Sequence, residues 1–247
     1  MEKNIDALLV EKGINSIRLT SEYEFNNIDF LKEYKLDFIE SIDLLSDSIE
    51  NIEGLYSLKN LKRINNTKHR IEYSKFENLI SLGIELVDKY DIEELSKLHN
   101  LEDLSLLNKF TEKDLTKISN NKNLKKLTIR GSKLESLEGL QNFEKLEKLE
   151  LYHNRSLKSL KGIDNHQSLE EIIINSAPKL FEINKYLSKV TKVNFLSLDS
   201  KKVDSFKFLD LMKKIELCGI HNLISEVEDG DKAPLIRALK RTKGKIW

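Results

Sequence analysis

The sequence is poor in the residues that covalent cross-links, metal centres and membrane spans require. Its 247 residues include one cysteine, two prolines and one tryptophan. The single cysteine, Cys218, excludes a disulfide framework and a metal site made of cysteines alone. No run of 18 apolar residues occurs, so the sequence predicts no transmembrane helix.

The chain also has no excess of either charge. Lysine and arginine number 41, aspartate and glutamate number 41, and the formal net charge at pH 7 is zero. Proteins that bind nucleic acid present a basic face to the phosphates, so this balance argues against a nucleic-acid partner. Residues 1–13 carry Glu2, Asp6 and Glu11 and have no long apolar stretch, which is unlike a secretion signal. We therefore predict a cytoplasmic protein that binds neither nucleic acid nor a membrane.

Leucine and isoleucine are abundant and recur at a regular interval. The chain contains 41 leucines and 25 isoleucines but only four alanines. Residues 146–160 follow the pattern L-x-x-L-x-L-x-x-N-x-L-x-x-L, and its first six positions recur along the chain. The middle apolar residue of each copy serves as an anchor, and the anchors are Ile17, Ile42, Ile64, Leu82, Leu104, Leu127, Leu149, Ile172, Val193 and Ile215. Seven of the nine spacings lie within one residue of 22, which predicts ten repeats.

The second and third repeats are the irregular ones. The spacings at their outer ends are 25 and 18 residues. In the third repeat Asn66 stands where an apolar residue is expected. The register of these two repeats is therefore left open.

The repeat pattern predicts a stacked architecture. In the segment x-L-x-L-x the apolar residues point to one face of a short strand and the others to the opposite face. A return segment follows each strand and carries its own apolar residues, such as Leu134, Leu137, Leu140 and Phe143. Because no single repeat can bury its leucines alone, the repeats must stack into one continuous core.

These motifs resemble the leucine-rich-repeat superfamily over residues 14–217. The form L-x-x-L-x-G-L, at 134–140 and 157–163, is most similar to bacterial internalin-type and phosphatase-regulator-type repeats. The family's turn asparagine is clear only at Asn154, which implies stacking less regular than in a consensus array. The resemblance implies an α/β fold: a leucine-rich-repeat solenoid, a curved right-handed coil with about ten short parallel strands on its concave face and short helical caps.

Both ends of the chain are predicted to cap the solenoid, because terminal leucines would otherwise face water. Residues 2–12 are predicted to form a short helix that stops at Gly13, and residues 233–243 a second helix. The resulting division of a single domain is an N-terminal cap (1–13), repeats (14–217) and a C-terminal cap with a basic helix (218–247).

The C-terminal cap has six basic residues and no acidic residue between positions 232 and 245. One hypothesis is a contact surface for an acidic partner. The alternative, which we favour, is a solvated helix face with cations near the helix C-terminus, where the helix dipole favours them. Trp247 ends the chain, and the sequence leaves open whether it packs on the last repeat or anchors an interface.

No catalytic motif stands out. The five histidines are scattered without metal-binding spacing, and phosphate-binding glycine loops and nucleophile-elbow motifs are missing. Cys218 and His221 lie three residues apart and could form a thiolate–imidazole pair, so an enzyme that uses Cys218 is one hypothesis. A small buried hydrophobe is the favoured interpretation of Cys218. We therefore predict that the protein is not an enzyme and needs neither a cofactor nor a metal ion.

Solenoids of this kind usually bind through the concave strand face. Leu107, Tyr152 and Leu196 are predicted there, directly after their strands, with Ile173 beside them. Apolar side chains aligned on consecutive repeats and flanked by charges are typical of an interface core with a polar rim. The predicted partner-binding residues are Leu107, Arg130, Glu150, Tyr152, Ile173, Asn175, Asn194 and Leu196.

These observations predict a non-catalytic module that binds a partner protein through its concave face. A rigid, preformed arc would bury the partner's surface at little ordering cost. The abundance of lysine, isoleucine and asparagine indicates an AT-rich bacterial genome, and our specific hypothesis is an intracellular bacterial immunity protein that blocks a cognate toxin. The alternative is a regulatory subunit of an enzyme such as a phosphatase. The sequence leaves open the partner's identity, the oligomeric state and the use of the convex face instead.

Overall fold

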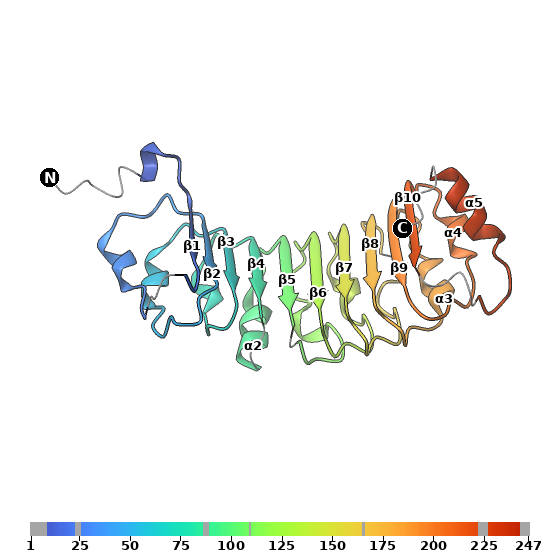
Figure 1. Cartoon of the computed structure of the whole chain (residues 1–247), viewed down its shortest axis with the longest axis horizontal. Coiled ribbons are helices and arrows are strands. Elements are labelled where there is room, and N and C mark those ends of the chain that lie inside the picture. The colour runs from blue at the N-terminus through green and yellow to red at the C-terminus, as the bar shows by residue number, and fades with distance from the viewer. Residues whose placement is uncertain are drawn as a thin grey trace.

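The structure is a computed structural model that describes residues 9–22, 26–85, 89–108, 110–164, 166–221 and 227–242. Within these ranges ten strands form one sheet, in which each strand pairs in parallel with the next strand along the chain. Figure 1 shows the strands side by side in chain order. The predicted solenoid with ten parallel strands is confirmed.

Each strand is four or five residues long, and the return segments contain short helices or single helical turns. The strands are β1 (Ser16–Leu19), β2 (Ser41–Leu44), β3 (Arg63–Asn66), β4 (Ser81–Ile84), β5 (Asp103–Leu107), β6 (Lys126–Arg130), β7 (Lys148–Tyr152), β8 (Glu171–Asn175), β9 (Phe195–Asp199) and β10 (Leu217–His221). The α-helices are α2 (Lys89–Lys97), α3 (Ile183–Leu187), α4 (Phe208–Leu211) and α5 (Ala233–Arg241). The 3-10 turns are η1 (Asp29–Glu33), η2 (Glu53–Ser57), η3 (Tyr73–Lys75), η4 (Thr116–Ile118) and η5 (Leu140–Asn142).

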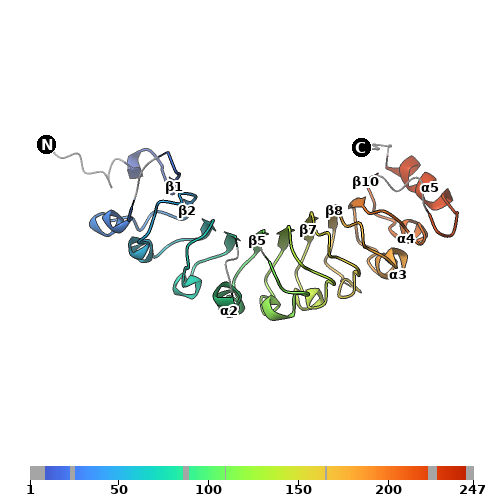
Figure 2. The ribbon, with the colours of Figure 1, turned by 60° about the horizontal axis from the view of Figure 1, so that its bottom comes forward.

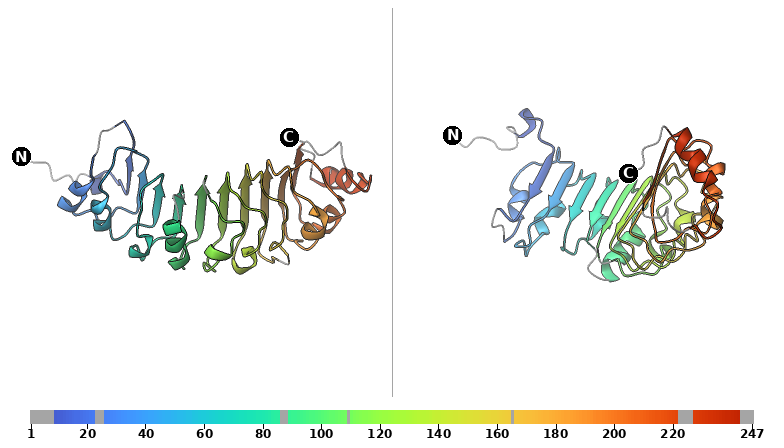
Figure 3. Two further views of the ribbon diagram at one scale, coloured as in Figure 1. Left: turned by 90° about the horizontal axis from the view of Figure 1, so that it is seen from below. Right: turned by 45° about the vertical axis from the view of Figure 1, so that its right-hand side comes forward.

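The sheet lies on the inner side of an arc. Figure 2 shows the strands along the concave side and the return segments, including α2 and α3, along the convex side. Figure 3 shows α5 at the C-terminal end of the arc, beyond β10. The return segments are wider than the spacing of about 4.8 Å between paired strands, so stacking them makes the solenoid curve.

The core runs the length of the solenoid between the sheet and the return segments. On β7 the side chains of Leu149 and Leu151 are fully buried. Leu134, Leu137 and Phe143, from the return segment before β7, are equally buried. The apolar residues therefore divide between strand and return segment as the repeat pattern predicts.

The register predicted for the first eight repeats is confirmed. Strand pairing joins each predicted anchor to the next, from Ile17 on β1 to Ile172 on β8. The irregular third repeat keeps this register, and Asn66 pairs with Ile84. The pattern therefore holds even where the spacing between anchors shortens to 18 residues.

Asn66 is tolerated in the core because its amide group is hydrogen-bonded. Its Nδ2 donates to the Tyr73 hydroxyl oxygen at 3.0 Å, and its Oδ1 accepts the His69 backbone N–H at 3.0 Å. Burial raises the pKa of the Tyr73 phenol, so this hydroxyl stays neutral. A buried polar group that finds partners in this way costs little stability.

The register predicted for the last two repeats is wrong. Ile172 on β8 pairs with Leu196, not with Val193, and Leu196 pairs with Cys218 on β10. The anchors of these repeats are therefore Leu196 and Cys218, three residues after the predicted ones. Val193 and Ile215 are also buried, but they precede the strands.

Two registers fit the local sequence equally well in the ninth repeat. The predicted one used Val190, Val193 and Phe195, whereas the structure uses Val193, Leu196 and Leu198. The return segment before β9 is longer than its neighbours, and it buries Val190 as well. The register that buries more apolar side chains against the neighbouring strand is the one adopted.

The predicted caps agree with the described part of each end. Residues 9–11 are helical, and Gly13, with φ +65°, donates its N–H to the Val10 carbonyl at 3.0 Å. The rest of the helix predicted at 2–12 lies outside the described residues. At the other end α5 forms as predicted, with the Ala233 N–H donating to Asp231 Oδ1 at 2.9 Å. Trp247 lies outside the described residues.

Candidate protein-binding face

The concave face is formed by the first, third and fifth residues of each five-residue strand. On β7, β8 and β9 the second and fourth residues are buried, and the other three are half-buried. Because the strands are paired in register, side chains at equal positions line up across the sheet. The concave face is thus a grid of side chains held by a rigid sheet.

Six of the eight predicted partner-binding residues lie on this face as expected. They are Leu107 on β5, Arg130 on β6, Glu150 and Tyr152 on β7, and Ile173 and Asn175 on β8. Neighbouring strands bring them together, since Leu107 pairs with Arg130, Arg130 with Tyr152, and Tyr152 with Asn175. Whether they contact a partner stays a prediction.

The other two predicted residues are misplaced, because the register of the ninth repeat is shifted by three residues. Leu196 is fully buried in the core, where it pairs with Ile172. Asn194 precedes β9, and its Nδ2 donates to Glu170 Oε2 at 3.5 Å. Leu196 therefore cannot contact a partner while the protein is folded.

The corrected register brings two apolar residues to the concave face that the sequence analysis missed. Phe195 on β9 and Leu217 on β10 are half-buried and pair with each other. With Tyr152 and Ile173 they form a diagonal across β7–β10, which we call the apolar stripe. The signal that could have found them is the second in-phase pattern, Val193-x-x-Leu196-x-Leu198.

A network of charges borders the apolar stripe. Glu150 Oε2 accepts a hydrogen bond from the Thr128 hydroxyl at 2.8 Å, and Lys126 Nζ lies 3.5 Å from the same oxygen. Lys148 Nζ lies 3.3 Å from Glu150 Oε1. Burial raises the pKa of this carboxyl, but the Thr128 hydrogen bond and the two lysines outweigh it, so the pKa is lowered overall. Glu150 is therefore a fixed negative charge on the concave face.

Tyr152 is held in place by its neighbours on the same face. The Arg130 guanidinium lies 5.6 Å from the centre of the Tyr152 ring, within the range of a cation–π interaction. The Tyr152 hydroxyl lies 3.5 Å from Glu150 Oε1. Partial burial, followed by the nearby Glu150 charge, raises the pKa of the phenol. A neutral aromatic side chain in a fixed position loses little entropy on binding.

The N-terminal half of the concave face is polar and largely paired with itself. Arg18 Nε donates to Asp43 Oδ2 at 2.9 Å, and Asn65 Nδ2 donates to Asp43 Oδ1 at 2.6 Å. On the next strand Gly83 leaves room for Asn65, since a Cβ at Gly83 would lie 2.5 Å from Asn65 Oδ1. The two halves of the face therefore differ, and the exposed apolar area of β7–β10 has no counterpart among these paired side chains.

The predicted basic helix, α5, uses two of its cations for packing. Arg237 Nε donates to Asp210 Oδ1 on α4 at 3.0 Å, and Arg241 donates to the Leu209 carbonyl at 2.7 Å. These contacts support the favoured interpretation of the helix as part of the cap. Lys243 and Lys245 lie outside the described residues.

Cys218 is a buried residue of the core. Its side chain is 1% exposed, and burial raises the pKa of the thiol to about 12. The sequence analysis also placed Cys218 directly after the last strand, which is wrong, because it is an inward residue of β10. The thiolate needed for nucleophilic attack is therefore scarce at neutral pH.

We expect the Cys218 thiol of the folded protein to react slowly with a thiol reagent. A pKa near 12 instead of 9.0 lowers the thiolate fraction at pH 8 about a thousandfold. The rate of labelling by an aromatic disulfide reagent, measured with and without 6 M urea, tests this. Rapid stoichiometric labelling without urea would revive the hypothesis of an enzyme that uses Cys218.

Two further kinds of site were sought. Among the described residues, no group of three or more His, Cys, Asp or Glu side chains is placed to hold a metal ion. No helix in the described ranges is both long and apolar enough to cross a membrane.

Comparison with solved structures finds related folds of low sequence identity. The leucine-rich repeat domain of the type III effector XopL matches with a TM-score of 0.61 and 16% identity, over 89% of this chain and 82% of that one. An internalin (inlF) from Listeria monocytogenes matches with a TM-score of 0.56 and 18% identity, over 87% and 70%. An internalin C2 from the same species has a TM-score of 0.51 and 16% identity, over 85% and 81%. No protein-family model and no curated protein matches the chain.

These similarities concern the fold alone. Ten parallel strands in register, an apolar core shared between strands and return segments, and the matched structures define the class. The protein is a leucine-rich-repeat solenoid.

Proposed function

We propose that the protein is a non-catalytic module that binds a partner protein through the C-terminal half of its concave face. The observation that carries this proposal is the apolar stripe of Tyr152, Ile173, Phe195 and Leu217. Its residues lie on four consecutive strands and remain half-exposed. Apolar groups at the centre of a charged rim are typical of protein interfaces.

The rim of this surface supports a protein partner rather than a nucleic acid. Lys126, Lys148 and Arg130 alternate with Glu150 and Glu171, and Lys148 Nζ lies 2.7 Å from Glu171 Oε2. A phosphate backbone would require a predominantly basic surface. Mixed charges favour a partner with a complementary arrangement of both signs.

As a more specific function we propose a cytoplasmic bacterial immunity protein that occludes a cognate toxin. Its support is the fit between a rigid binding face and a role that requires only tight occlusion. The alternative, a regulatory subunit of an enzyme such as a phosphatase, rests on the similarity of the repeats. The two differ in what happens to the partner: an immunity protein abolishes its activity, whereas a regulatory subunit leaves it active with altered specificity.

The test is affinity purification from the native organism with the wild-type protein and with the double variant Tyr152→Asp, Ile173→Asp. Each substitution places a carboxylate in the centre of the apolar stripe, where desolvating it costs binding energy. We expect the captured partner to be lost, with a decrease in affinity of at least about a hundredfold. The partner's activity with and without the purified protein then separates occlusion from regulation.

A matched control adds the same charge at the other end of the same face. The double variant Ser16→Asp, Thr20→Asp alters exposed or half-exposed residues at β1. It is expected to retain the partner. If both double variants fold and capture the partner as the wild type does, the concave face is not the binding surface.

A further inference from the structure

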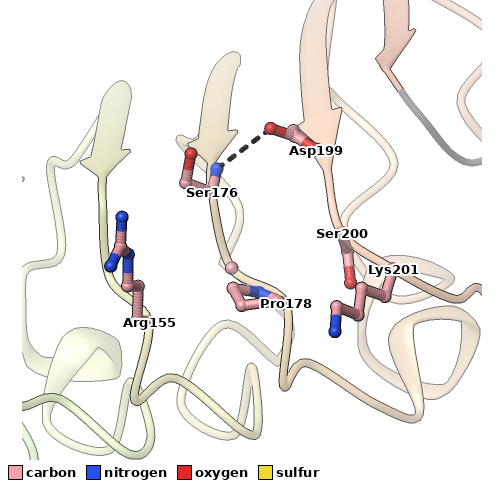
Figure 4. Close-up of a pocket in the computed structure, with 7 residues that line it drawn as sticks. Arg155, Ser176, Pro178, Asp199, Ser200 and Lys201 are labelled. Carbon is pink, nitrogen blue, oxygen red and sulfur yellow. Dashed lines mark hydrogen bonds between the residues drawn. The ribbon is translucent and has the colours of Figure 1, made fainter.

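Two neighbouring cavities lie at the edge of the solenoid where the chain leaves β7, β8 and β9 (Figure 4). The larger, of about 320 Å³, is lined by Arg155, Ser176, Pro178 and Lys201 among others. The smaller, of about 240 Å³, shares Pro178 and Lys201 with it and adds Phe181. Together the two cavities form a surface that we call the turn-edge groove.

The groove exists because the pairing between turns changes at this point. One turn earlier the His153 N–H donates to the Asn175 carbonyl at 2.9 Å. The corresponding N–H of Ser176 instead donates to the side chain of Asp199, at 3.3 Å, as Figure 4 shows. The backbone ladder resumes one residue later, where the Ala177 N–H donates to the Asp199 carbonyl at 3.2 Å. This local shift separates the turns.

The groove carries cations that are not neutralised. Arg155 and Lys201 line the larger cavity, and Lys179 lines the smaller one. Within the described ranges the side chains of these three residues form no ion pair and no hydrogen bond. Elsewhere lysines pair across repeats, as Lys158 does with Glu135 at 2.7 Å. Unpaired cations around a hollow favour an anionic ligand.

Most carboxylates of the groove are already engaged. Asp199 and Asp204 accept backbone N–H groups, and Glu182 forms an ion pair with Lys185 at 2.9 Å. Glu228 is the one groove carboxylate without a side-chain partner among the described residues. One free carboxylate against three free cations leaves a positive balance for a ligand.

The smaller cavity also presents an exposed aromatic side chain. Phe181 is 52% exposed, and it is the only aromatic residue with a largely exposed side chain in the described part of the chain. Leu180 beside it is buried in the core, which fixes the backbone at this position. An apolar contact is therefore available directly beside the cationic cavity.

We propose that the turn-edge groove binds an acidic segment of a protein partner. A carboxylate of this segment lies between Arg155 and Lys201, and an adjacent apolar side chain covers Phe181. Arginine favours a carboxylate because its planar donors match the two oxygens. The proposal rests on the proposed function only in taking the ligand to be part of a protein, and it adds a second contact site outside the concave face.

The test uses a blocked tetrapeptide, acetyl-Gly-Glu-Leu-Gly-amide, titrated into isotope-labelled protein and followed by amide NMR. We expect shifts of the Ser176, Ala177 and Lys201 amides that saturate with weak affinity. The glutamine counterpart of the peptide, and the variant Arg155→Gln, Lys201→Gln with the original peptide, should each bind about tenfold more weakly. Both substituted side chains are exposed, so the variant is expected to fold.

The control variant is Lys133→Gln, Lys214→Gln, which removes two exposed positive charges outside the groove. It should bind the glutamate peptide as the wild type does. Equal binding of the glutamate and glutamine peptides, or shifts only at residues outside the groove, would overturn the proposal. Because this titration does not involve the concave face, its failure leaves the capture experiment unaffected, and loss of capture leaves the titration unaffected.

Discussion

Replacing Leu196 with aspartate is expected to unfold the protein or to lower its free energy of unfolding by at least about 4 kcal/mol. Leu196 is fully buried and pairs with Ile172 and Cys218 on the neighbouring strands. A carboxylate there would have neither water nor a cation. The adjacent substitution Phe195→Asp is expected to cost only about 1 kcal/mol, because Phe195 lies half-exposed on the concave face.

The pair of variants is a direct test of the register. Urea unfolding followed by circular dichroism gives the free energy of unfolding for each. The register inferred from the sequence, with Phe195 inward and Leu196 outward, makes the opposite prediction. A stable Leu196→Asp variant beside an unfolded Phe195→Asp variant would therefore show that β9 is three residues out of register, and it would remove Phe195 from the apolar stripe.

The second large effect is expected at Gly162, in the repeated form L-x-x-L-x-G-L. Gly162 has φ +106°, and a Cβ there would lie 2.0 Å from the Leu137 carbonyl oxygen of the preceding repeat. The backbone cannot relieve this contact without separating the two repeats. We expect Gly162→Ala to lower the free energy of unfolding by about 3 kcal/mol or more, measured by urea unfolding.

Gly13 provides the matched control for the glycine substitution. Its φ is +65°, but a Cβ there would have no atom within 4 Å. Gly13→Ala should therefore show the conformational penalty alone, about 1 kcal/mol. Equal losses in the two variants would mean that the repeats do not approach each other at Gly162 as closely as the structure shows.

The proposed function makes the two halves of the concave face unequal. The side chains of Arg18, Asp43 and Asn65 are tied to one another, whereas the apolar stripe is open. Breaking a paired polar group costs a binding partner more than covering an apolar one. A partner is therefore expected to cover β7–β10 first, next to the turn-edge groove.

Much of this architecture follows from the sequence. The alternation x-L-x-L-x and the interval near 22 residues determine the strands, their order and the core, because only stacking buries the leucines of each repeat. The same alternation places Glu150, Tyr152 and Ile173 on the concave face, since residues on either side of an inward leucine must point outward. The division of the surface is readable wherever one register alone fits.

The tertiary structure decided what the local pattern could not. At 190–198 two registers place apolar residues at the same spacing, and only pairing with Ile172 selects Leu196 as the inward residue. Asn66 is a poor core residue by composition, yet the Tyr73 hydroxyl, seven residues away, satisfies its amide. The turn-edge groove depends on one hydrogen bond between Ser176 and Asp199 of adjacent repeats. Such choices rest on contacts between repeats, and no periodicity within a single repeat encodes them.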